Sequence, residues 1–397
     1  MTNQSFNRAS ASNGFFLDPA EQIRYARQLS LPEFGLQGQA ELKKGRILCV
    51  GAGGLGSPAL IYLAAAGVGK IGIIDPDVVD TSNLHRQIVH GDGDVGTPKI
   101  QSAAAKLKDI NPHVEVHCHE GSFTKENAIQ IAREYDIIVD GTDNFATRYL
   151  TNDVAYLLGK PNVYGSVLRF EGQCSVFAPH LGGPCYRCLF PQPPKKGVVP
   201  NCAEGGVLGV LPGIIGTIQA LEAIKLLTQA GESLVGRLVH FDALTFRMRE
   251  FSLKRDKNCP LCGENPEITA LGNYDDSCEV LGGTRNESDC EAQVPSVSVN
   301  ALAAKLMSNH SILLDVREDF ETNICRIPEA VFVPLADLEA RYLELDPKIE
   351  TFVLCKSGYR SEIAATFLLE KGFKRVFNVT GGIDEWAKKI DHEMPRY

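Results

Sequence analysis

The feature that most constrains the fold is a glycine-rich run, GAGGLG (51–56), which directly follows the apolar run RILCV (46–50). Its three spaced glycines permit a tight turn and a close approach of the backbone to a phosphate group, and a following helix would offer its N-terminal N–H groups. Asp75 comes about twenty residues later, after a second apolar run, where a carboxylate can accept from ribose hydroxyls. This pattern predicts a bound ribonucleotide and leaves NAD, FAD and ATP open.

Strand and helix patterns alternate from residue 46 to about residue 160, which predicts a Rossmann-like α/β domain with a mostly parallel sheet and helices on both faces. A long helix is expected at 216–229. The chain has 397 residues, more than a single core usually supports, so two domains are expected. We predict a first domain over 1–280, an acidic, Gly/Ser/Asn-rich linker over 281–293, and a smaller α/β domain over 294–397.

Charge and cysteine content narrow the function classes. The net charge of −9 argues against a nucleic-acid partner. The polar N-terminus lacks the apolar core of an export signal, so we expect a cytoplasmic protein whose twelve cysteines serve as metal ligands, nucleophiles or core residues rather than disulfides. The weakly polar run 205–221 contains Gly and Pro, which favours a buried loop and helix over a membrane span.

Two cations follow the ribose-binding carboxylate, Arg86 and Lys99. Such cations suit a triphosphate, whose charge rises as pyrophosphate leaves. Asp143 and Asn144 follow another strand, at the sheet edge where ligands bind, and a carboxylate there can hold Mg²⁺ against phosphate oxygens. Because these cations would go unused in an NAD dehydrogenase, that is the weakest interpretation.

Eight segments together make the chain resemble the MoeB/ThiF family of ubiquitin-activating-enzyme-like adenylyltransferases over about residues 21–270. They are RYARQ (24–28), GAGGLG, DPDVVDTSNLHRQ, GTPK, DGTDN, RFEGQ, GGPCYRC and NCAEGG. The resemblance implies that Arg27, in RYARQ, reaches the ATP of the other subunit in a homodimer. It also implies that ATP is held by Gly54, Asp75, Ser82, Asn83, Leu84, His85, Arg86, Lys99, Asp143 and Asn144.

Two C-x-x-C pairs predict a metal site: Cys185 with Cys188, and Cys259 with Cys262. This spacing lets both sulfurs of a pair face one tetrahedral metal, and two pairs complete a Cys₄ site. A redox role is less favoured, because neither pair opens a helix after a strand. The family resemblance also implies structural Zn²⁺ here, and a site with four cysteine ligands leaves no open position for catalysis.

Cys202 lies in a Pro/Gly-rich stretch (191–213), which predicts a mobile loop. In the family, a cysteine here is a candidate for attack on an activated acyl group. The alternative is an unreactive loop cysteine, because thiolate activation cannot be inferred from sequence. His117 and His119 share a strand face and are interpreted as surface residues rather than a metal site.

Near the C-terminus, TFVLC places Cys355 at the end of an apolar strand, before the loop KSGYR and a helix. Successive backbone N–H groups and the helix dipole are expected to lower the pKa of this thiol. With LLDVRE (313–318) and NVTGGIDEW (378–386), the segment 294–397 resembles the rhodanese-like sulfurtransferases.

The cysteine loop separates this resemblance from cysteine phosphatases. The spacing from Cys355 to Arg360 is C-x4-R rather than the C-x5-R of the phosphatases, and the smaller loop suits a persulfide sulfur. One departure is Cys325, in CRIPEA, where the family has a histidine; this position is not the nucleophile. An inactive rhodanese-fold binding module is the alternative.

The two halves together predict one reaction. The C-terminal glycine of a ubiquitin-like sulfur-carrier protein (MoaD/ThiS-like, ending in Gly-Gly) is adenylylated, and a persulfide on Cys355 then supplies sulfur to give a thiocarboxylate. Arg27, Arg86 and Lys99 stabilise the developing charge, and Asp143 positions Mg²⁺. Cys202 resolves the acyl intermediate, and a persulfide donor such as a cysteine desulfurase loads Cys355.

Two other functions stay open at this stage. One is an activating enzyme that forms a thioester at Cys202 and passes a ubiquitin-like modifier to proteins. The other is a nucleotide-sensing scaffold without turnover. The molybdopterin, thiamine, cysteine and tRNA thiolation pathways all remain possible settings for the sulfur carrier.

Overall fold

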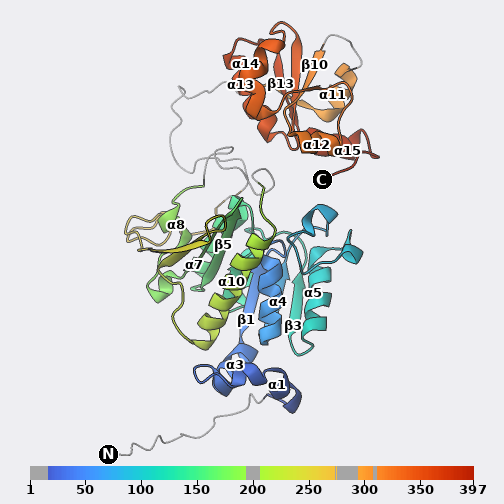
Figure 1. Ribbon diagram of the computed structural model, residues 1–397. Helices are drawn as coiled ribbons and strands as arrows, with labels where there is room; N and C mark the ends of the chain where they lie inside the picture. Colours follow the sequence, from blue (N-terminus) through green and yellow to red (C-terminus); the bar gives the residue numbers. More distant parts are fainter. Residues whose placement is uncertain (1–16, 194–205, 273, 275–293, 307–310) are drawn as a thin grey trace, which may run out of the picture. The chain divides into compact units, whose positions relative to one another are not determined.

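The computed structural model describes residues 17–193, 206–272, 274, 294–306 and 311–397. The chain divides into two compact units, Met1–Glu279 and Val280–Tyr397, and each is described by itself (Figure 1). The predicted linker (281–293) and Cys202 lie outside the described residues.

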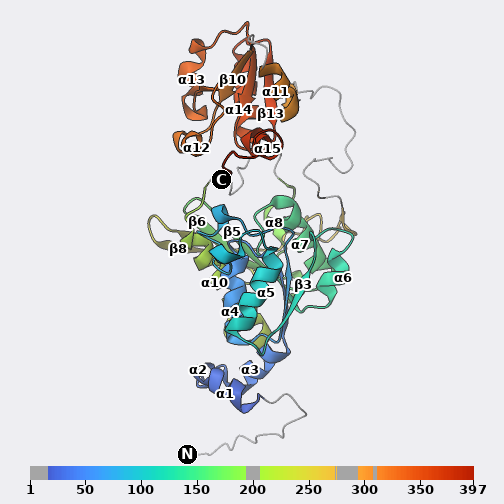
Figure 2. The ribbon, with the colours of Figure 1, turned by 90° about the vertical axis from the view of Figure 1, so that its right-hand side faces the viewer.

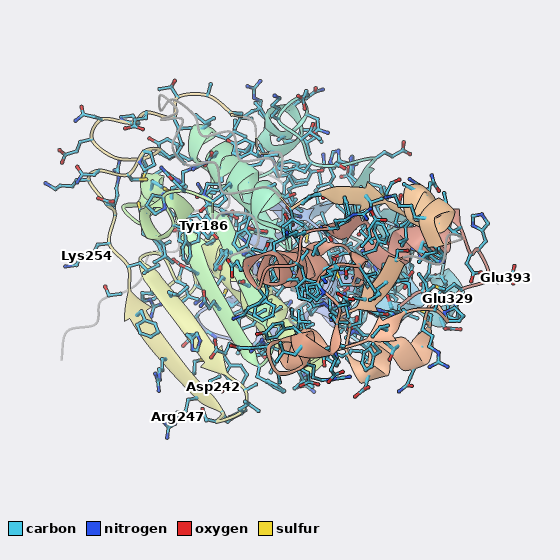
Figure 3. The ribbon with its side chains drawn as sticks, turned by 90° about the horizontal axis from the view of Figure 1, so that it is seen from above. Tyr186, Asp242, Arg247, Lys254, Glu329 and Glu393 are labelled. Atoms are coloured by element: carbon cyan, nitrogen blue, oxygen red, sulfur yellow. The ribbon has the colours of Figure 1, made fainter. Side chains whose placement is uncertain are left out.

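The first unit is built on an eight-stranded sheet with the order β3-β2-β1-β4-β5-β6-β7-β8. The strands from β3 to β5 pair in parallel, and the remaining pairings are antiparallel, which confirms the predicted mostly parallel α/β sheet. Asp242 and Arg247 pair at the turn end of the β7–β8 hairpin (Figure 3). The strands are β1 (Arg46–Val50), β2 (Lys70–Ile74), β3 (Glu115–His119), β4 (Ile137–Asp140), β5 (Asn162–Leu168), β6 (Glu171–Phe177), β7 (Arg237–Asp242) and β8 (Arg247–Ser252).

Helices cover both faces of this sheet (Figure 2). Alternate residues of β1 point to opposite faces, as the strand geometry requires: Ile47 and Cys49 pack in one core, and Leu48 and Val50 in another. Both faces are therefore apolar. The first core includes α4 (Gly56–Ala66), α5 (Lys99–Ile110) and α10 (Val210–Thr228), and the second includes α6 (Ala128–Arg133) and α7 (Phe145–Leu157).

Three short helices precede β1: α1 (Pro19–Arg24), α2 (Ala26–Leu29) and α3 (Gly35–Lys44). The first two are separated at Tyr25, a buried residue whose hydroxyl accepts a hydrogen bond from Asn111 at 2.8 Å. Gln28 donates to the carbonyl oxygen of Ala66 at 3.1 Å. This contact places α2 at the C-terminal end of α4.

Helix α10 begins at Val210, so the last residues of the predicted loop (191–213) are helical, and that part of the prediction is wrong. Pro212 is tolerated because it lies in the first helical turn. By length and composition α10 resembles a membrane span, but it packs against α4 and the sheet. Its Gln219 is buried and donates to the carbonyl oxygens of Asp140 and Val163, so α10 is a core helix of this unit.

The second unit has a five-stranded parallel sheet with the order β11-β10-β12-β13-β9. Phe352 and Leu354 of β12 pack on one face, and Val353 and Cys355 on the other. The short edge strand β9 was not predicted. The strands are β9 (Ser296–Ser298), β10 (Ser311–Asp315), β11 (Val331–Phe332), β12 (Glu350–Leu354) and β13 (Val376–Thr380), and the α-helices are α11 (Val299–Leu306), α12 (Asp319–Ile324), α13 (Leu338–Arg341), α14 (Tyr359–Glu370) and α15 (Gly382–Lys389).

Candidate functional site

The carboxyl ends of β1, β2 and β4 meet at one edge of the first sheet. Val50 of β1 is level with Ile74 of β2 and with Asp140 of β4, and all three strands run in parallel. The glycine run follows β1, Asp75 follows β2, and Asp143 follows β4. The structure therefore brings the predicted nucleotide-binding segments to one edge, which is where open α/β sheets bind ligands.

Glycines at this edge let main chain touch main chain. Gly51 has φ +97°, and a Cβ atom there would lie 2.8 Å from the carbonyl oxygen of Gly141. A Cβ atom on Gly56 would lie 2.0 Å from the carbonyl oxygen of Gly51. Helix α4 follows directly, and no described side chain caps its N-terminus. The N–H of Ser57 donates to the carbonyl oxygen of Gly53 at 2.9 Å and Pro58 has no N–H, so a phosphate at this end of the helix would be bound by N–H groups of the glycine run.

Asp75 is buried and faces the glycine run. Its carboxylate accepts from the N–H of Ala52 at 2.8 Å and from the N–H of Asp77 at 2.9 Å. Burial raises the pKa of Asp75, and the positive charge of Lys99 opposes that rise. Each carboxylate oxygen keeps capacity for a further donor, which is what binding a ribose hydroxyl requires.

The predicted residues from Ser82 to Arg86 form one turn folded around the Arg86 guanidinium. Arg86 donates to the side chain of Asn83 at 2.6 Å and to the carbonyl oxygen of Ser82 at 3.3 Å. It also lies 2.7 Å from Nε2 of His85, and burial followed by this positive charge lowers the pKa of His85. Leu84 ends the short helix at Thr81–Asn83.

Gly54 and Lys99 are two further residues that were predicted to hold ATP. A Cβ atom on Gly54 would be 3.2 Å from Pro212 and 3.6 Å from Cγ of Arg86, so Gly54 and Arg86 are neighbours. Lys99 is the first residue of α5 and is 4% exposed. Its ammonium group lies 2.8 Å from the carboxylate of Asp77, an exposed partner that a phosphate group could replace.

The turn after β4 carries Asp143 and Asn144. Asn144 caps α7 by accepting from the N–H of Thr147 at 2.8 Å. On the same helix, Arg148 is buried, donates to the carbonyl oxygen of Thr142 at 3.0 Å, and lies 3.7 Å from Asp140. Arg148 and Asp140 were not predicted as site residues. An aspartate before this turn and an arginine after it could have indicated an ion pair that holds the turn.

Asp140 and Arg148 are not fully satisfied. Oδ2 of Asp140 and Nε of Arg148 are buried and have no hydrogen-bond partner among the described residues. Burial raises the pKa of Asp140, while Arg148 and Thr142 oppose that rise. Oδ2 of Asp140 and Nε of Arg148 face each other at 3.7 Å, so the two residues form an ion pair without a hydrogen bond, and Arg148 also holds the carbonyl oxygen of Thr142 just before Asp143.

Arg27 is the one described candidate for the nucleotide site that the structure does not bring there. It lies on α2, beside the C-terminal end of α4, whereas the glycine run precedes the N-terminal end of α4. The eleven residues of α4 span about 16 Å. Arg27 is therefore remote from the nucleotide edge of its own chain.

The two C-x-x-C pairs come together in one cluster. The Sγ atoms of Cys185, Cys188, Cys259 and Cys262 all lie within 4.8 Å of one another. Individual Sγ–Sγ distances are 3.4 Å, 3.5 Å and 3.8 Å. A tetrahedral Zn–S₄ centre with bonds of about 2.3 Å needs sulfur atoms about 3.8 Å apart. Cys188 also accepts from the N–H of Asp256, so the donor set fits a closed structural metal site.

In the second unit, Cys355 follows β12 and is fully buried. Its Sγ accepts from the N–H of Gly358 at 3.1 Å and lies 3.2 Å from the hydroxyl oxygen of Ser361. Ser361 is itself held by the side-chain oxygen of Asn378 at 2.7 Å. Ser361 and Asn378 were not predicted as site residues. Ser361 could have been, because a hydroxyl residue in the first turn of the helix after the cysteine loop indicates a polar neighbour for the sulfur.

Arg360 ends the cysteine loop. Its guanidinium is hydrogen-bonded to Glu321 and not to Sγ of Cys355. Two hydrogen bonds of 2.5 Å and 2.7 Å join its guanidinium to both oxygens of Glu321. Cys325, the departure from the family pattern, is buried, and its carbonyl oxygen accepts from Arg317 at 2.9 Å. Cys325 therefore has a packing role in the loop before β11.

Comparisons with known proteins identify the family of each unit. The ThiF family matches residues 25–261, and the rhodanese-like domain matches residues 298–389. The adenylyltransferase and sulfurtransferase MOCS3 of Arabidopsis thaliana is 41% identical over 404 residues, covering 96% of this chain and 86% of that protein. The probable adenylyltransferase/sulfurtransferase MoeZ of Mycobacterium tuberculosis is 44% identical over 387 residues, covering 96% of each.

A solved structure shares the fold at low identity. The crystal structure of E. coli MccB with MccA-N7isoASN has a TM-score of 0.55 and 20% identity, over 60% of this chain and 74% of that one. An adenylyltransferase takes its adenylyl group from ATP, so the adenylation domain implies use of ATP. The chain therefore belongs to the ThiF family, carries a rhodanese-like domain after it, and is an enzyme with adenylyltransferase and sulfurtransferase activities.

Proposed function

We propose that this enzyme adenylylates the C-terminal glycine of a ubiquitin-like sulfur-carrier protein and then transfers sulfur to it from a persulfide on Cys355. The observation that carries the proposal is the surroundings of Cys355. Its Sγ lies at a strand end, accepts a hydrogen bond from Gly358, lies beside the hydroxyl of Ser361, and belongs to the same chain as an adenylation domain. A thiol so placed suits a sulfur anion that must attack an activated carboxylate.

In the first step, an oxygen of the glycine carboxylate attacks the α-phosphorus of ATP, and pyrophosphate leaves. Arg86 lies beside Gly54 and Lys99 lies close enough to Asp75 to oppose the rise of its pKa, and both would stabilise the charge that develops on the phosphates. Asp75 binds the ribose. Asp143 would hold Mg²⁺, which neutralises phosphate charge when bound, and the Arg148–Thr142 hydrogen bond fixes the turn that presents this carboxylate.

The distance of Arg27 from its own nucleotide edge supports a homodimer. A cation near the α-phosphate would strengthen charge stabilisation, yet α4 separates Arg27 from the glycine run of the same chain. In a two-fold dimer each chain can supply Arg27 to its partner's site. The trans contact is thus a proposal about assembly as well as about chemistry.

In the second step, the terminal sulfur of the Cys355 persulfide attacks the acyl carbon, and AMP leaves. The product is an acyl disulfide that joins the carrier to Cys355. The thiolate of Cys202 then attacks Sγ of Cys355, the carrier thiocarboxylate leaves, and a disulfide between the two cysteines forms. A thiol reductant returns both cysteines to the reduced state, and a persulfide donor such as a cysteine desulfurase reloads Cys355.

The remaining assignments follow the chemistry of the site. We propose that the four-cysteine cluster holds Zn²⁺ in a structural role, because its sulfur spacing fits a closed tetrahedral site. We place the enzyme in the cytoplasm, where its free thiols would stay reduced.

The test uses the full-length enzyme with purified carriers ending in Gly-Gly, ATP and a persulfide source. Intact mass spectrometry should show one carrier gaining the mass difference of sulfur for oxygen, which depends on ATP. A thiol-labile adduct between carrier and enzyme that depends on Cys202 and not on persulfide would instead favour modifier transfer. Failure of every carrier to stimulate ATP–pyrophosphate exchange would overturn the proposed substrate.

A further inference from the structure

Tyr397 makes three polar contacts beside the cysteine loop. Its hydroxyl lies 2.7 Å from Oε1 of Glu321 and 3.0 Å from Nη1 of Arg317. Its ring lies under the ammonium group of Lys356, which is 4.6 Å from the ring centroid. The ring and Lys356 also line a cavity of about 10 Å³, which is room for about one water molecule.

These contacts reach both ends of the loop 355–360. Lys356 directly follows the cysteine, and Arg360 ends the loop and is paired with Glu321 through two hydrogen bonds. Tyr397 thus touches one loop cation directly and the other through a single carboxylate. Tyr397 lies outside the three sequence motifs of this domain, which are 313–318, 355–360 and 378–386.

The hydroxyl of Tyr397 has a fixed orientation. Arg317 can only donate and an ionised glutamate can only accept, so the hydroxyl accepts from Arg317 and donates to Glu321. Arg317 is itself fully buried and is held by Asp315 at 2.7 Å, which anchors the arrangement to β10. Replacing the hydroxyl would leave both of its neighbours one partner short.

We propose that Tyr397 is a positioning residue of the sulfur-transfer site, which holds Lys356 through its ring and the Arg360–Glu321 pair through its hydroxyl, so that the loop keeps its shape and presents Lys356 to an anionic sulfur donor. The inference rests on the proposed role of Cys355 as the sulfur carrier within the enzyme. It adds a residue that neither touches the reacting sulfur nor belongs to the loop.

Thiosulfate is a suitable anionic probe. The Cys355 thiolate attacks its outer sulfur, the S–S bond breaks, and sulfite leaves, which forms the persulfide. Cyanide then takes the terminal sulfur as thiocyanate, and the thiolate returns. The kcat and KM for thiosulfate are measured on the full-length enzyme, because a donor-positioning role should change KM, whereas general damage to the domain should lower kcat.

Two substitutions separate the two contacts of Tyr397. Tyr397→Leu loses both, and its KM for thiosulfate should rise about two- to fivefold, the effect expected from loss of one partly exposed cation–π contact. Tyr397→Phe keeps the ring over Lys356 and loses the hydroxyl. Its KM for thiosulfate should therefore lie between the KM of the wild-type enzyme and that of Tyr397→Leu. Lys356→Met should raise KM in the wild-type background and add little in Tyr397→Leu, because the two changes remove the same interaction.

Tyr342 provides a matched control, since its ring has a cation–π contact with Lys371 at 5.7 Å away from the cysteine loop. Tyr342→Leu should leave KM unchanged. An unchanged KM in both Tyr397 variants, or an additive effect of Lys356→Met, overturns the inference. If Tyr397→Leu does not fold, the comparison of Tyr397→Phe with wild type decides. Thiocyanate formation that persists in Cys355→Ala would instead refute the proposed role of Cys355.

Discussion

Arg148 donates a hydrogen bond to the carbonyl oxygen of Thr142 at 3.0 Å, one residue before Asp143 in the chain. The same guanidinium lies 3.7 Å from the buried carboxylate of Asp140, at the end of β4. A charged pair below the nucleotide edge therefore fixes the turn that carries the proposed Mg²⁺ ligand. The geometry of this turn therefore depends on Arg148, a buried side chain outside the set of residues predicted to hold ATP.

Replacing Arg148 should damage both stability and adenylylation. Arg148→Met leaves Asp140 buried without its cation, and breaking a buried pair costs about 3–5 kcal/mol. Denaturant unfolding followed by circular dichroism and carrier-dependent ATP–pyrophosphate exchange would measure the two effects. Arg46 pairs with Asp136 at the surface, so Arg46→Met is the matched control and should cost at most about 1 kcal/mol. Equal losses in the two variants would contradict this account.

Mixing two inactive variants should restore activity if Arg27 acts across a dimer. In the proposed dimer, each site takes Asp143 from one chain and Arg27 from the other. Arg27→Ala and Asp143→Ala therefore remove contributions that come from different chains. After subunit exchange, half of the dimers are mixed, and one site in each mixed dimer is intact, which gives about a quarter of the wild-type sites. ATP–pyrophosphate exchange is the readout. No recovery, despite mixed dimers seen by native mass spectrometry, would place Arg27 outside the partner's site.

The cysteine cluster should contain roughly one zinc ion per chain, as a closed four-thiolate site does. Cys259→Ser should lose the metal and lower the thermal unfolding temperature, because metal binding contributes directly to folding. Elemental analysis and calorimetry give the two readouts. Cys174 is buried in the same unit outside the cluster, so Cys174→Ser should keep the metal. Full metal content in Cys259→Ser would refute the site.

Cys355→Ala should separate the two activities. Carrier-dependent ATP–pyrophosphate exchange should remain at the wild-type rate, whereas thiocarboxylate formation should stop, because the persulfide has no sulfur to form on. Cys325→Ala is the control within the same unit and should retain sulfur transfer, since Cys325 packs against Arg317. If exchange were lost in a folded Cys355→Ala enzyme, the proposed division of labour would be wrong.

The second unit should lose stability in acid through Glu321. Burial alone raises the pKa of Glu321, but hydrogen bonds from Arg360, the Glu318 N–H and Tyr397 outweigh it and lower the pKa from about 4.5 to about 2. The ionised form is therefore the one that folding favours. Its contribution, on the order of 2–3 kcal/mol, is complete above pH 4.5 and is lost as the pH falls through about 2.

Trp386 is the only tryptophan of the chain and lies in α15, so its fluorescence reports unfolding of the second unit alone. Urea unfolding of Glu321→Gln should show a smaller loss of stability between pH 4.5 and pH 2 than the wild type shows. Glu339, exposed on α13, provides the control, and Glu339→Gln should follow the wild-type curve. Parallel pH curves for Glu321→Gln and wild type would argue against the lowered pKa.

Local patterns predicted the elements whose signals are local. GAGGLG marks a turn that only glycine can make, and the two C-x-x-C pairs each encode a knuckle within four residues. The first sheet, the family and both activities were predicted correctly from such signals. The joining of the cysteine pairs, which are 74 residues apart, had to be inferred from the number of ligands a metal needs.

Other features depend on which strands become neighbours. Helix α7 was not predicted because its buried face includes Asn152 and Asp153, which hide the apolar period. Strand β8 is exposed throughout, so it shows no alternation. Tyr397 gains its role from partners supplied by a distant segment, which no motif records.

The close approach of Gly56 to Gly51 also limits how this enzyme can recover from mutation. An overpacked residue is usually rescued by a second-site suppressor that shortens the neighbouring side chain. Here the neighbour is the carbonyl oxygen of Gly51, which would lie 2.0 Å from the new Cβ atom and is present in every amino acid. No substitution at position 51 can remove it, so a side chain at Gly56 has no suppressor at the residue that it strikes.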